Sequence, residues 1–263
     1  MLVEPRKVRA VERVYLRYGR RLLRRAFARV WLGGAAWPTQ PRPAIAFANH
    51  SAWWDPVVAL FLSHDLFRRD PYGVMAGEQL RRFPFFRAIG CFGTTTESLA
   101  DTRRLIEYAA GVLRDEEGGG VPPRVLWIFP QGALLPPRAP LAFASGLARL
   151  ARLVPEAMLV PVAVRYEFRA EQRPECFVRV GEALCGAAAA ADGGSPRALT
   201  RRLEARLAAE LRTLDEELAR GESSPPAGYR VVLEGRGSLH TFYERTLGRL
   251  QRAASREQRA EED

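Results

Sequence analysis

The 263-residue sequence predicts an α/β protein with a mainly parallel sheet flanked by helices. Two observations predict this class. Short apolar stretches, typical of buried strands, alternate along the chain with longer amphipathic stretches, typical of helices. Hydrophobic residues make up 47% of the chain, which is enough for a substantial core at this length. Every apolar stretch falls short of the roughly 20 residues that cross a bilayer, and we expect neither a membrane-spanning helix nor a signal peptide.

The N-terminal segment, residues 8–34, predicts a basic amphipathic helix. Arginines separate apolar residues that recur at near-helical spacing, namely Val11, Val14, Tyr15, Tyr18, Leu22, Phe27, Val30 and Trp31. A helix of this kind lies in a membrane interface, or packs on a domain while its arginines contact lipid phosphates. An ordinary surface helix would show the same pattern. We expect membrane contact and assign residues 1–36 to a membrane-interface helix.

Strands and helices then alternate after a linker marked by Pro38, Pro41 and Pro43. The expected strands cover residues 44–49, 72–77, 91–96, 124–129, 157–168 and 176–184. The expected helices cover residues 56–67, 78–90 with a break near Pro84, 98–117 with Ser98 as its cap, 141–154, 196–220 and 238–254. We therefore divide the chain into the N-terminal helix, a core at 37–190 and a C-terminal helical extension at 191–263.

The net charge of +10 comes almost wholly from arginine, since Lys7 is the only lysine. Such a surplus attracts nucleic acid, an anionic bilayer or a phosphorylated substrate, although GC-rich coding also favours arginine. The arginines lie mainly on amphipathic helices beside aliphatic and aromatic residues, which favours a membrane surface over nucleic acid.

The cysteines Cys91, Cys176 and Cys185 are scattered along the chain and odd in number. They form neither a disulfide framework nor a metal-ligand spacing, which fits a reducing compartment. We expect no metal site.

The stretch "FANHSAWWDP", residues 47–56, contains a candidate catalytic pair, His50 and Asp55. On one continuous helix, residues five apart point about 140° away from each other. An aspartate before a proline, however, is a favoured helix start, with aspartate as N-cap and proline as the first helical residue. The preceding residues should then form a turn that folds His50 back onto Asp55, and a carboxylate on the far ring nitrogen makes histidine a general base. Asp55 could also serve only as a cap.

Five stretches, taken in order, resemble the motifs of the glycerolipid acyltransferase family, which includes the lysophosphatidic acid acyltransferases. "NHSAWWD" resembles the family's Asn-His-x-x-x-x-Asp motif, and residues 78–96 resemble its second block. "WIFPQGALLPP" is similar to the third block, normally Phe-Pro-Glu-Gly-Thr-Arg. "FASGLARLA" followed by "LVPVAV" resembles the family's glycine helix and fourth block. The similarity covers roughly residues 40–185.

The resemblance implies a glycerol-3-phosphate acyltransferase-like fold and a lipid O-acyltransferase. His50 would take the proton from an acceptor hydroxyl that attacks an acyl thioester, and Asp55 would orient it. Backbone N–H groups near Gly132 would bind the oxyanion, and Pro161 would shape a wall of the site. The implied substrate-binding residues are Asn49, Gly93, Thr94, Phe129, Pro130, Gln131, Gly132, Arg138 and Pro161. The donor would be acyl-CoA or an acyl carrier protein, with no cofactor. We expect His64 and His240 to be non-catalytic.

The third motif departs from the family at Gln131 and Leu134, where members that acylate a phosphate-bearing glycerol usually have glutamate and arginine. Leucine cannot bind phosphate, whereas arginine can bond two phosphate oxygens at once. Arg138 or Arg103 could substitute for the missing arginine. The expected acceptor is 1-acyl-glycerol-3-phosphate or another lysophospholipid. An uncharged hydroxyl lipid such as a glycosylated carotenoid remains an alternative, and an inactive lipid-binding relative is a second one.

The expected location is the cytoplasmic face of a bacterial inner membrane, with the protein bound peripherally to membrane lipids and without a nucleic-acid partner. We expect Trp53 and Trp54 to form an apolar surface at the mouth of the site.

Overall fold

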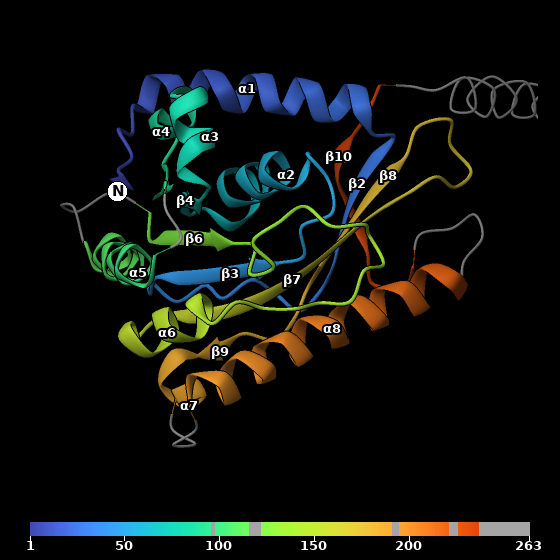
Figure 1. Cartoon of the computed structure of the whole chain (residues 1–263). Helices are drawn as coiled ribbons and strands as arrows, with labels where there is room; N and C mark the ends of the chain where they lie inside the picture. Colours follow the sequence, from blue (N-terminus) through green and yellow to red (C-terminus); the bar gives the residue numbers. More distant parts are fainter. Residues whose placement is uncertain (96–97, 116–121, 191–194, 221–225, 237–263) are drawn as a thin grey trace, which may run out of the picture.

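The structure, a computed structural model, describes residues 1–95, 98–115, 122–190, 195–220 and 226–236. Its centre is one sheet in the order β1-β5-β4-β6-β3-β7-β8-β2-β10 (Figure 1). The middle of the sheet consists of parallel strands, namely β5 (Cys91–Thr94), β4 (Asp70–Val74), β6 (Arg124–Ile128), β3 (Ala44–Ala48) and β7 (Met158–Glu167). The prediction of an α/β fold with a mainly parallel sheet is confirmed.

The strands beyond this parallel block change direction. β8 (Glu175–Val180) is antiparallel to β7, β2 (Arg29–Gly34) is parallel to β8, and β10 (Arg230–Glu234) is antiparallel to β2. At the other edge β1 (Leu2–Val3) pairs antiparallel with β5, and β9 (Leu184–Cys185) pairs antiparallel with the start of β7.

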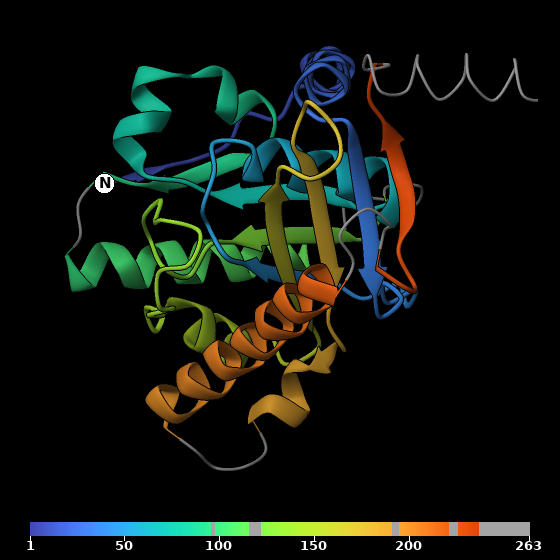
Figure 2. The ribbon, with the colours of Figure 1, turned by 90° about the vertical axis from the view of Figure 1, so that its right-hand side faces the viewer.

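Helices cover both faces of the sheet, as Figures 1 and 2 show. One face carries α1 (Arg9–Ala26), α2 (Asp55–Phe61) with its π-helical continuation η1 (Leu62–Phe67), α3 (Gly77–Arg82) and α4 (Phe85–Ala88). The other carries α5 (Leu99–Arg114), α6 (Gly146–Leu153), α7 (Gly186–Ala190) and α8 (Pro196–Arg220). Alternate residues of β3 enter the two cores, because successive side chains of a strand point to opposite faces: Ile45 and Phe47 pack toward α8, and Ala46 packs toward α2.

The predicted helix at 8–34 is wrong beyond Ala26, where α1 ends. Residues 29–34 instead form β2, which places Val30 and Trp31 in the core. The physical reason is burial. In β2 the Val30 side chain is fully buried and the Trp31 Nε1–H donates to Glu175 Oε1 at 2.9 Å, which a helix lying in a membrane interface would not provide. Residues 29–34 of the expected membrane-interface segment therefore belong to the sheet.

The expected helix at 141–154 begins only at Gly146. The backbone N–H groups before it form hydrogen bonds with residues far away in sequence: the Phe143 N–H donates to Glu204 Oε2 and the Ala144 N–H donates to the Pro130 carbonyl. The expected helix at 78–90 divides into α3 and α4 around Pro84, as predicted. The helices at 98–117 and 196–220 are confirmed as α5 and α8, and Ser98 caps α5 by accepting from the Asp101 N–H.

The sequence pattern did not predict the short elements β1, β9, α7 and β10. The expected tail helix at 238–254, with His240, lies outside the described residues. No helix in the described part of the chain is both long enough and apolar enough to cross a membrane.

Because β3, β4 and β6 are parallel, the segments that leave their carboxyl ends lie near one another. The carboxyl ends of β3, β4 and β6 lie at one edge of the sheet, and open α/β sheets bind ligands at this edge. The segments leaving β3 and β6 there carry His50 and Gln131.

Candidate active site

His50 and Asp55 are brought together by the turn between β3 and α2. His50 Nδ1 lies 2.8 Å from Asp55 Oδ2, and the Asp55 side chain is buried while 22% of the His50 side chain is exposed. Both Asp55 oxygens already accept hydrogen bonds from other donors, so Nδ1 acts as the donor in this pair. The lone pair of the imidazole is therefore on Nε2, the atom available to a substrate.

Asp55 is held by three further donors. Its Oδ2 accepts from the Ser51 N–H at 2.8 Å and the Ala52 N–H at 2.9 Å, and its Oδ1 accepts from the Tyr166 hydroxyl at 2.6 Å. The predicted N-cap assignment is off by one residue: Trp54 is the cap position and Asp55 is the first residue of α2. Its carboxylate points toward the preceding turn, where it accepts from the N–H groups of Ser51 and Ala52.

Tyr166 was not among the candidate residues. Burial is the main cause that raises its pKa well above the usual range, and the nearby Cys176 and Asp55 add to the effect. Its hydroxyl therefore stays protonated and remains a donor to Asp55 across the pH range of ordinary enzymes. The ring also stacks on Phe27, just after α1. Tyr166 thus holds Asp55 through Oδ1, the oxygen that His50 does not contact.

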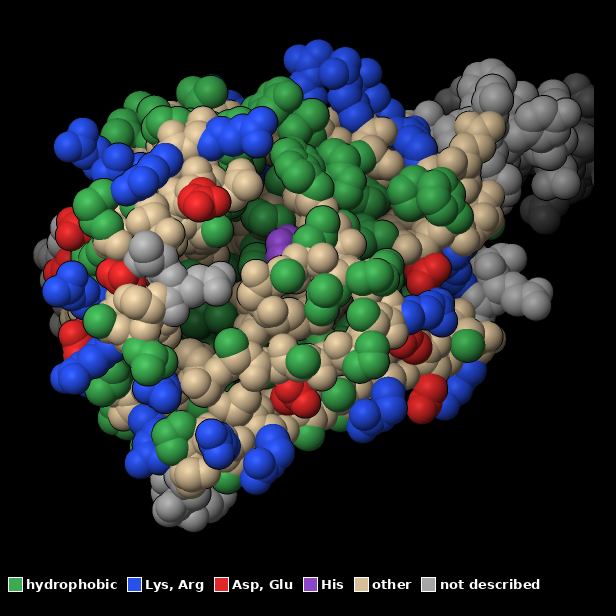
Figure 3. All heavy atoms as spheres, viewed as in Figure 1, with side chains coloured by type: hydrophobic (Ala, Val, Ile, Leu, Met, Phe, Trp, Pro, Cys, Tyr) green, Lys and Arg blue, Asp and Glu red, His purple; other side chains and the backbone are tan. Residues whose placement is uncertain are grey.

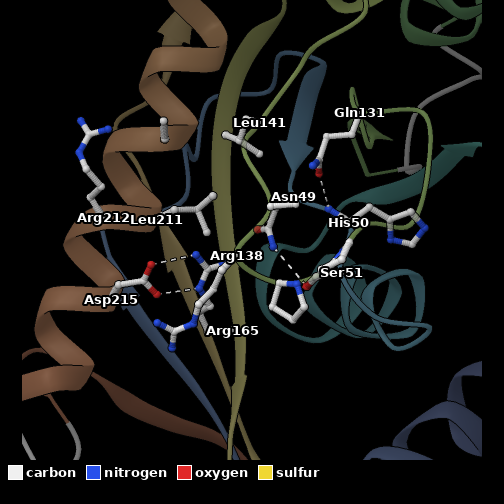
Figure 4. Close-up of a pocket in the computed structure, with 14 residues that line it drawn as sticks. Asn49, His50, Ser51, Gln131, Arg138, Leu141, Arg165, Leu211, Arg212 and Asp215 are labelled. Carbon is white, nitrogen blue, oxygen red and sulfur yellow. Dashed lines mark hydrogen bonds and ion pairs between the residues drawn. The ribbon is translucent and has the colours of Figure 1, made fainter.

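Asn49 and Gln131 fix the backbone of the same turn (Figure 4). The Asn49 side chain accepts from the Val164 N–H at 2.9 Å and donates to the Val164 carbonyl at 3.1 Å, which extends the β3–β7 pairing past the end of β3. Gln131 Oε1 accepts from the His50 N–H at 2.9 Å. The loop after β6 is thereby fastened to the histidine, and the Leu135 N–H donates to the His50 carbonyl at 3.0 Å.

His50 lines two cavities of different character. One, of about 470 Å³, has mainly apolar walls from α1, α2, β4, α4 and β6. The other, of about 270 Å³, has arginines and an aspartate in its walls. In the space-filling view a histidine side chain is visible at the side of a hollow that has hydrophobic side chains in its depth (Figure 3). The His50 ring also stacks on Phe129, with centroids 4.5 Å apart.

The other candidate residues divide between these cavities and the core. Thr94, Phe129 and Gly132 line the apolar cavity, and Asn49, Gln131 and Arg138 line the polar one. Gly93, Pro130 and Pro161 are buried and line neither. The Gly93 backbone packs so closely on the Met75 carbonyl that a Cβ atom would lie 1.7 Å from its oxygen. Pro161 pairs with Phe47 inside the sheet.

Three further findings bear on the expected roles. The Gly132 residue has a positive φ of 72°, and its N–H donates to the Phe129 carbonyl at 3.0 Å, so that N–H is already engaged within the turn. Arg103 is on α5, bonded to Glu107, and lines neither cavity. His64 Nε2 lies 3.0 Å from Glu12 Oε1, also away from both cavities.

The two tryptophans of the turn differ in their surroundings. Trp53 is 61% exposed, whereas Trp54 is partly buried and packs edge-on against Phe27. Trp53 therefore offers the larger apolar surface to solvent. Among the described residues no group of three or more histidine, cysteine, aspartate or glutamate side chains is arranged to hold a metal ion.

Comparisons with known proteins agree with this geometry. Among proteins of curated function, none matches the chain in sequence. In structure, the chain is similar to the 1-acyl-sn-glycerophosphate (LPA) acyltransferase PlsC from Thermotoga maritima, with a TM-score of 0.55 and 19% identity over 81% of this chain and 82% of that chain. At this identity the likeness shows the fold. The family model described as "Acyltransferase" matches residues 36–165, the range that contains His50, Asp55 and Gln131. Residues 36–165 therefore form an acyltransferase domain, and the protein is an acyltransferase.

Proposed function

We propose that the protein transfers an acyl chain from a thioester to the hydroxyl of a membrane lipid, with 1-acyl-glycerol-3-phosphate or another lysophospholipid as acceptor. One observation carries this proposal: His50, whose Nδ1 is bound by Asp55, lines both an apolar and a polar cavity. A lipid acceptor has the same two parts, an apolar chain and a polar headgroup, with the reacting hydroxyl between them.

The chemistry follows from the free nitrogen of His50. Nε2 takes the proton of the acceptor hydroxyl as the hydroxyl oxygen attacks the thioester carbonyl. The tetrahedral intermediate then collapses, the carbon–sulfur bond breaks, and the proton passes to the thiolate. The products are an ester and a free thiol. Asp55 stabilises the imidazolium formed in the first step, and it stays aligned because its two oxygens are fixed by the turn and by Tyr166.

The apolar cavity would hold an acyl chain. Its walls include Leu60, Met75, Phe86, Ile89 and Trp127, and removal of an acyl chain from water into such a site is favourable by about 0.8 kcal/mol for each methylene group. The donor in this proposal is acyl-CoA or an acyl carrier protein, and the enzyme acts at the cytoplasmic face of the inner membrane.

An uncharged hydroxyl lipid is the second candidate acceptor. The observation that favours it is Leu134, which is exposed, lines the apolar cavity and stands where phosphate-acylating members usually have arginine. A glycosylated carotenoid would need no cationic partner at that position.

Acyl transfer by purified protein tests the proposal. The assay offers acyl-CoA and acyl carrier protein as donors, and a lysophospholipid and a neutral monoacylglycerol as acceptors, in vesicles. The expected result is ester formation in the wild type and a loss of about 10²–10⁴-fold in His50→Ala and Asp55→Asn, since general-base catalysis is worth that much. His64→Ala is the matched control, because that histidine lies outside both cavities, and it should retain wild-type activity. Equal rates in wild type and His50→Ala would overturn the proposed mechanism.

A further inference from the structure

The polar cavity beside His50 is lined by a buried arginine on a mainly apolar strand. Arg165 lies near the end of β7 in the stretch "LVPVAVRYE", and its side chain is only 5% exposed. Its Nε and one of its Nη groups donate to the two carboxylate oxygens of Asp215 on α8, at 2.7 and 2.9 Å (Figure 4). This bidentate pair fixes the plane of the guanidinium.

The other terminal nitrogen, Nη1 of Arg165, is buried and meets no acceptor within the described part of the chain. A buried N–H of a charged group without an acceptor costs free energy. Arg165 is one of the residues that line the polar cavity, so an anionic ligand that reaches its guanidinium there would supply the acceptor. The arrangement is that of a fixed donor prepared for a ligand.

The charge of the cavity has the sign that an anion needs. Its charged walls are Arg138, Arg165 and Arg212 against the single carboxylate of Asp215. Arg138 is 77% exposed and has Glu167 as a partner only at 3.6 Å, so its side chain can turn toward a ligand. Arg138 lines the same cavity as Arg165, whereas Arg212 extends away from the Arg165–Asp215 pair in Figure 4. Two arginines are thus placed to act together, and a third lies at the rim.

We propose that this cavity, centred on Arg165 and Arg138, binds a phosphate group of a substrate. The planar guanidinium matches two phosphate oxygens at once. These arginines would supply the positive charge that is missing at Leu134, where phosphate-acylating members usually have arginine. Leu134 itself lines the other cavity. Arg212 and Asp215 lie on α8, beyond residues 36–165 that match the acyltransferase family model. The proposal rests on the proposed acyl transfer and names the group that its substrates must carry.

Two substrates of that reaction carry phosphate: a phosphorylated lipid acceptor, and a donor whose thioester is attached to a phosphopantetheine arm. The His50 ring points away from Arg165 across the turn (Figure 4), so either substrate would reach from one to the other along its own chain. Kinetics with phosphate-free partners separate the two sources.

The experiment uses the full chain and the variants Arg165→Gln, Arg165→Lys and Arg138→Gln. The acceptors are 1-acyl-glycerol-3-phosphate and the matching monoacylglycerol, and the donors are acyl-CoA and the acyl thioester of N-acetylcysteamine. The expected result is a KM about tenfold or more higher for one phosphate-bearing substrate in the two glutamine variants, as for the loss of a charge-assisted hydrogen bond. The KM for its phosphate-free counterpart and kcat should stay unchanged. Arg165→Lys should recover part of the loss.

The substrate whose KM rises identifies the source of the phosphate. Arg201→Gln is the matched control. Arg201 is an exposed arginine on α8, the helix that carries Arg212 and Asp215, and it lies about 16 Å from Arg212 along the helix axis. Equal losses with phosphate-bearing and phosphate-free substrates would assign Arg165 a structural role and overturn the proposal. Wild-type KM values for every substrate in both Arg138→Gln and Arg165→Gln would also overturn the proposal.

Binding separates a failure of this inference from a failure of the proposed function. Calorimetry with glycerol 3-phosphate and with phosphopantetheine needs no turnover. Binding of either compound by wild type, weakened about tenfold or more in a folded Arg138→Gln variant, supports the phosphate site even if no acyl transfer is found. Binding of neither compound overturns the site even if His50-dependent acyl transfer is found. Thermal melting of each variant confirms that it is folded.

Discussion

Gln131 lacks the charge of the glutamate that is usual in the family motif, but it makes a hydrogen bond to the backbone of His50. Its amide oxygen accepts the His50 N–H at 2.9 Å, and this bond joins the loop after β6 to the turn that carries the histidine. A carboxylate oxygen at the same place could accept the same N–H. The exchange of glutamate for glutamine therefore leaves the geometry of the His50 turn intact, and Leu134 is the more consequential departure from the family motif.

We therefore predict that Gln131→Glu retains activity within about threefold, whereas Gln131→Met loses about tenfold or more. The methionine side chain is of similar length but offers no comparable acceptor, and an N–H left without its partner costs roughly 1–3 kcal/mol. Steady-state kcat with saturating donor and acceptor checks both variants. If Gln131→Met were as active as Gln131→Glu, the hydrogen bond would have no part in positioning His50.

The sequence was sufficient to predict the contact between His50 and Asp55, because the signal was local: the Asp-Pro step predicted a helix start and hence a turn. It was insufficient for Tyr166, whose hydroxyl meets Asp55 only because β7 pairs with β3. Arg165 and Asp215 depend in the same way on how α8 packs on the sheet. A charged residue within an apolar strand was the one available signal, and it does not name its partner.

The element α1 is attached to the sheet face through buried charges near its N-terminus. Glu12 is buried and bonded to Lys7, Arg9 and His64, and Asp70 of β4 binds Lys7 at 2.5 Å and Arg9 at 2.6 Å. Burial alone would raise the pKa of Glu12, but the hydrogen bond from His64 and the charge of Lys7 outweigh it and lower the pKa to about 2. The ionised form of Glu12 therefore stabilises the fold.

This pKa predicts an acid-sensitive attachment of α1. A carboxyl with a lower pKa in the folded than in the unfolded state contributes stability above its unfolded value, 4.5, and that contribution falls as pH drops toward about 2. We expect the free energy of unfolding of wild type to decrease over this interval more steeply than that of Glu12→Gln, which has no such proton to bind. Urea unfolding followed by circular dichroism at pH 5, 4 and 3 measures both. Parallel slopes in the two proteins would contradict the prediction.

At the scale of elements, the pattern of the sequence predicted most of the sheet, because buried parallel strands are apolar runs such as "AIAFA" and "RVLWI". The error at β2 has a definite cause. Its apolar residues continue the helical spacing of α1, and only pairing with β8 and β10 distinguishes a strand there. The edge strands β1 and β10 are short or exposed, and they obtain their structure from neighbours far away in sequence.

Over the whole molecule, exposed apolar side chains and arginines gather on the face that carries α1 (Figure 3). On α1 itself Val14 is 67% and Tyr18 55% exposed, among the exposed arginines Arg13, Arg17, Arg21, Arg24 and Arg25. Trp53 continues this surface, since it packs edge-on against Trp54, which contacts Phe27 after α1. The apolar cavity reaches the same side of the sheet through Tyr15 and Leu60. These features support peripheral binding to an anionic bilayer, with the cavity next to its lipids.

A pair of matched substitutions tests that orientation. Val14→Asp places a carboxylate on α1, and Leu99→Asp places one on α5, at the opposite face, where Leu99 is 87% exposed. Both positions are exposed and helical, so both variants should fold. Val14→Asp loses apolar contact and adds repulsion of about 1 kcal/mol from an anionic surface, and its partition into vesicles should fall about tenfold, whereas Leu99→Asp should bind as wild type does. Flotation with vesicles containing anionic lipid at physiological salt measures the bound fraction. Equal binding by the two variants would show that α1 does not face the bilayer, and the apolar cavity would then have to receive its lipid from another side.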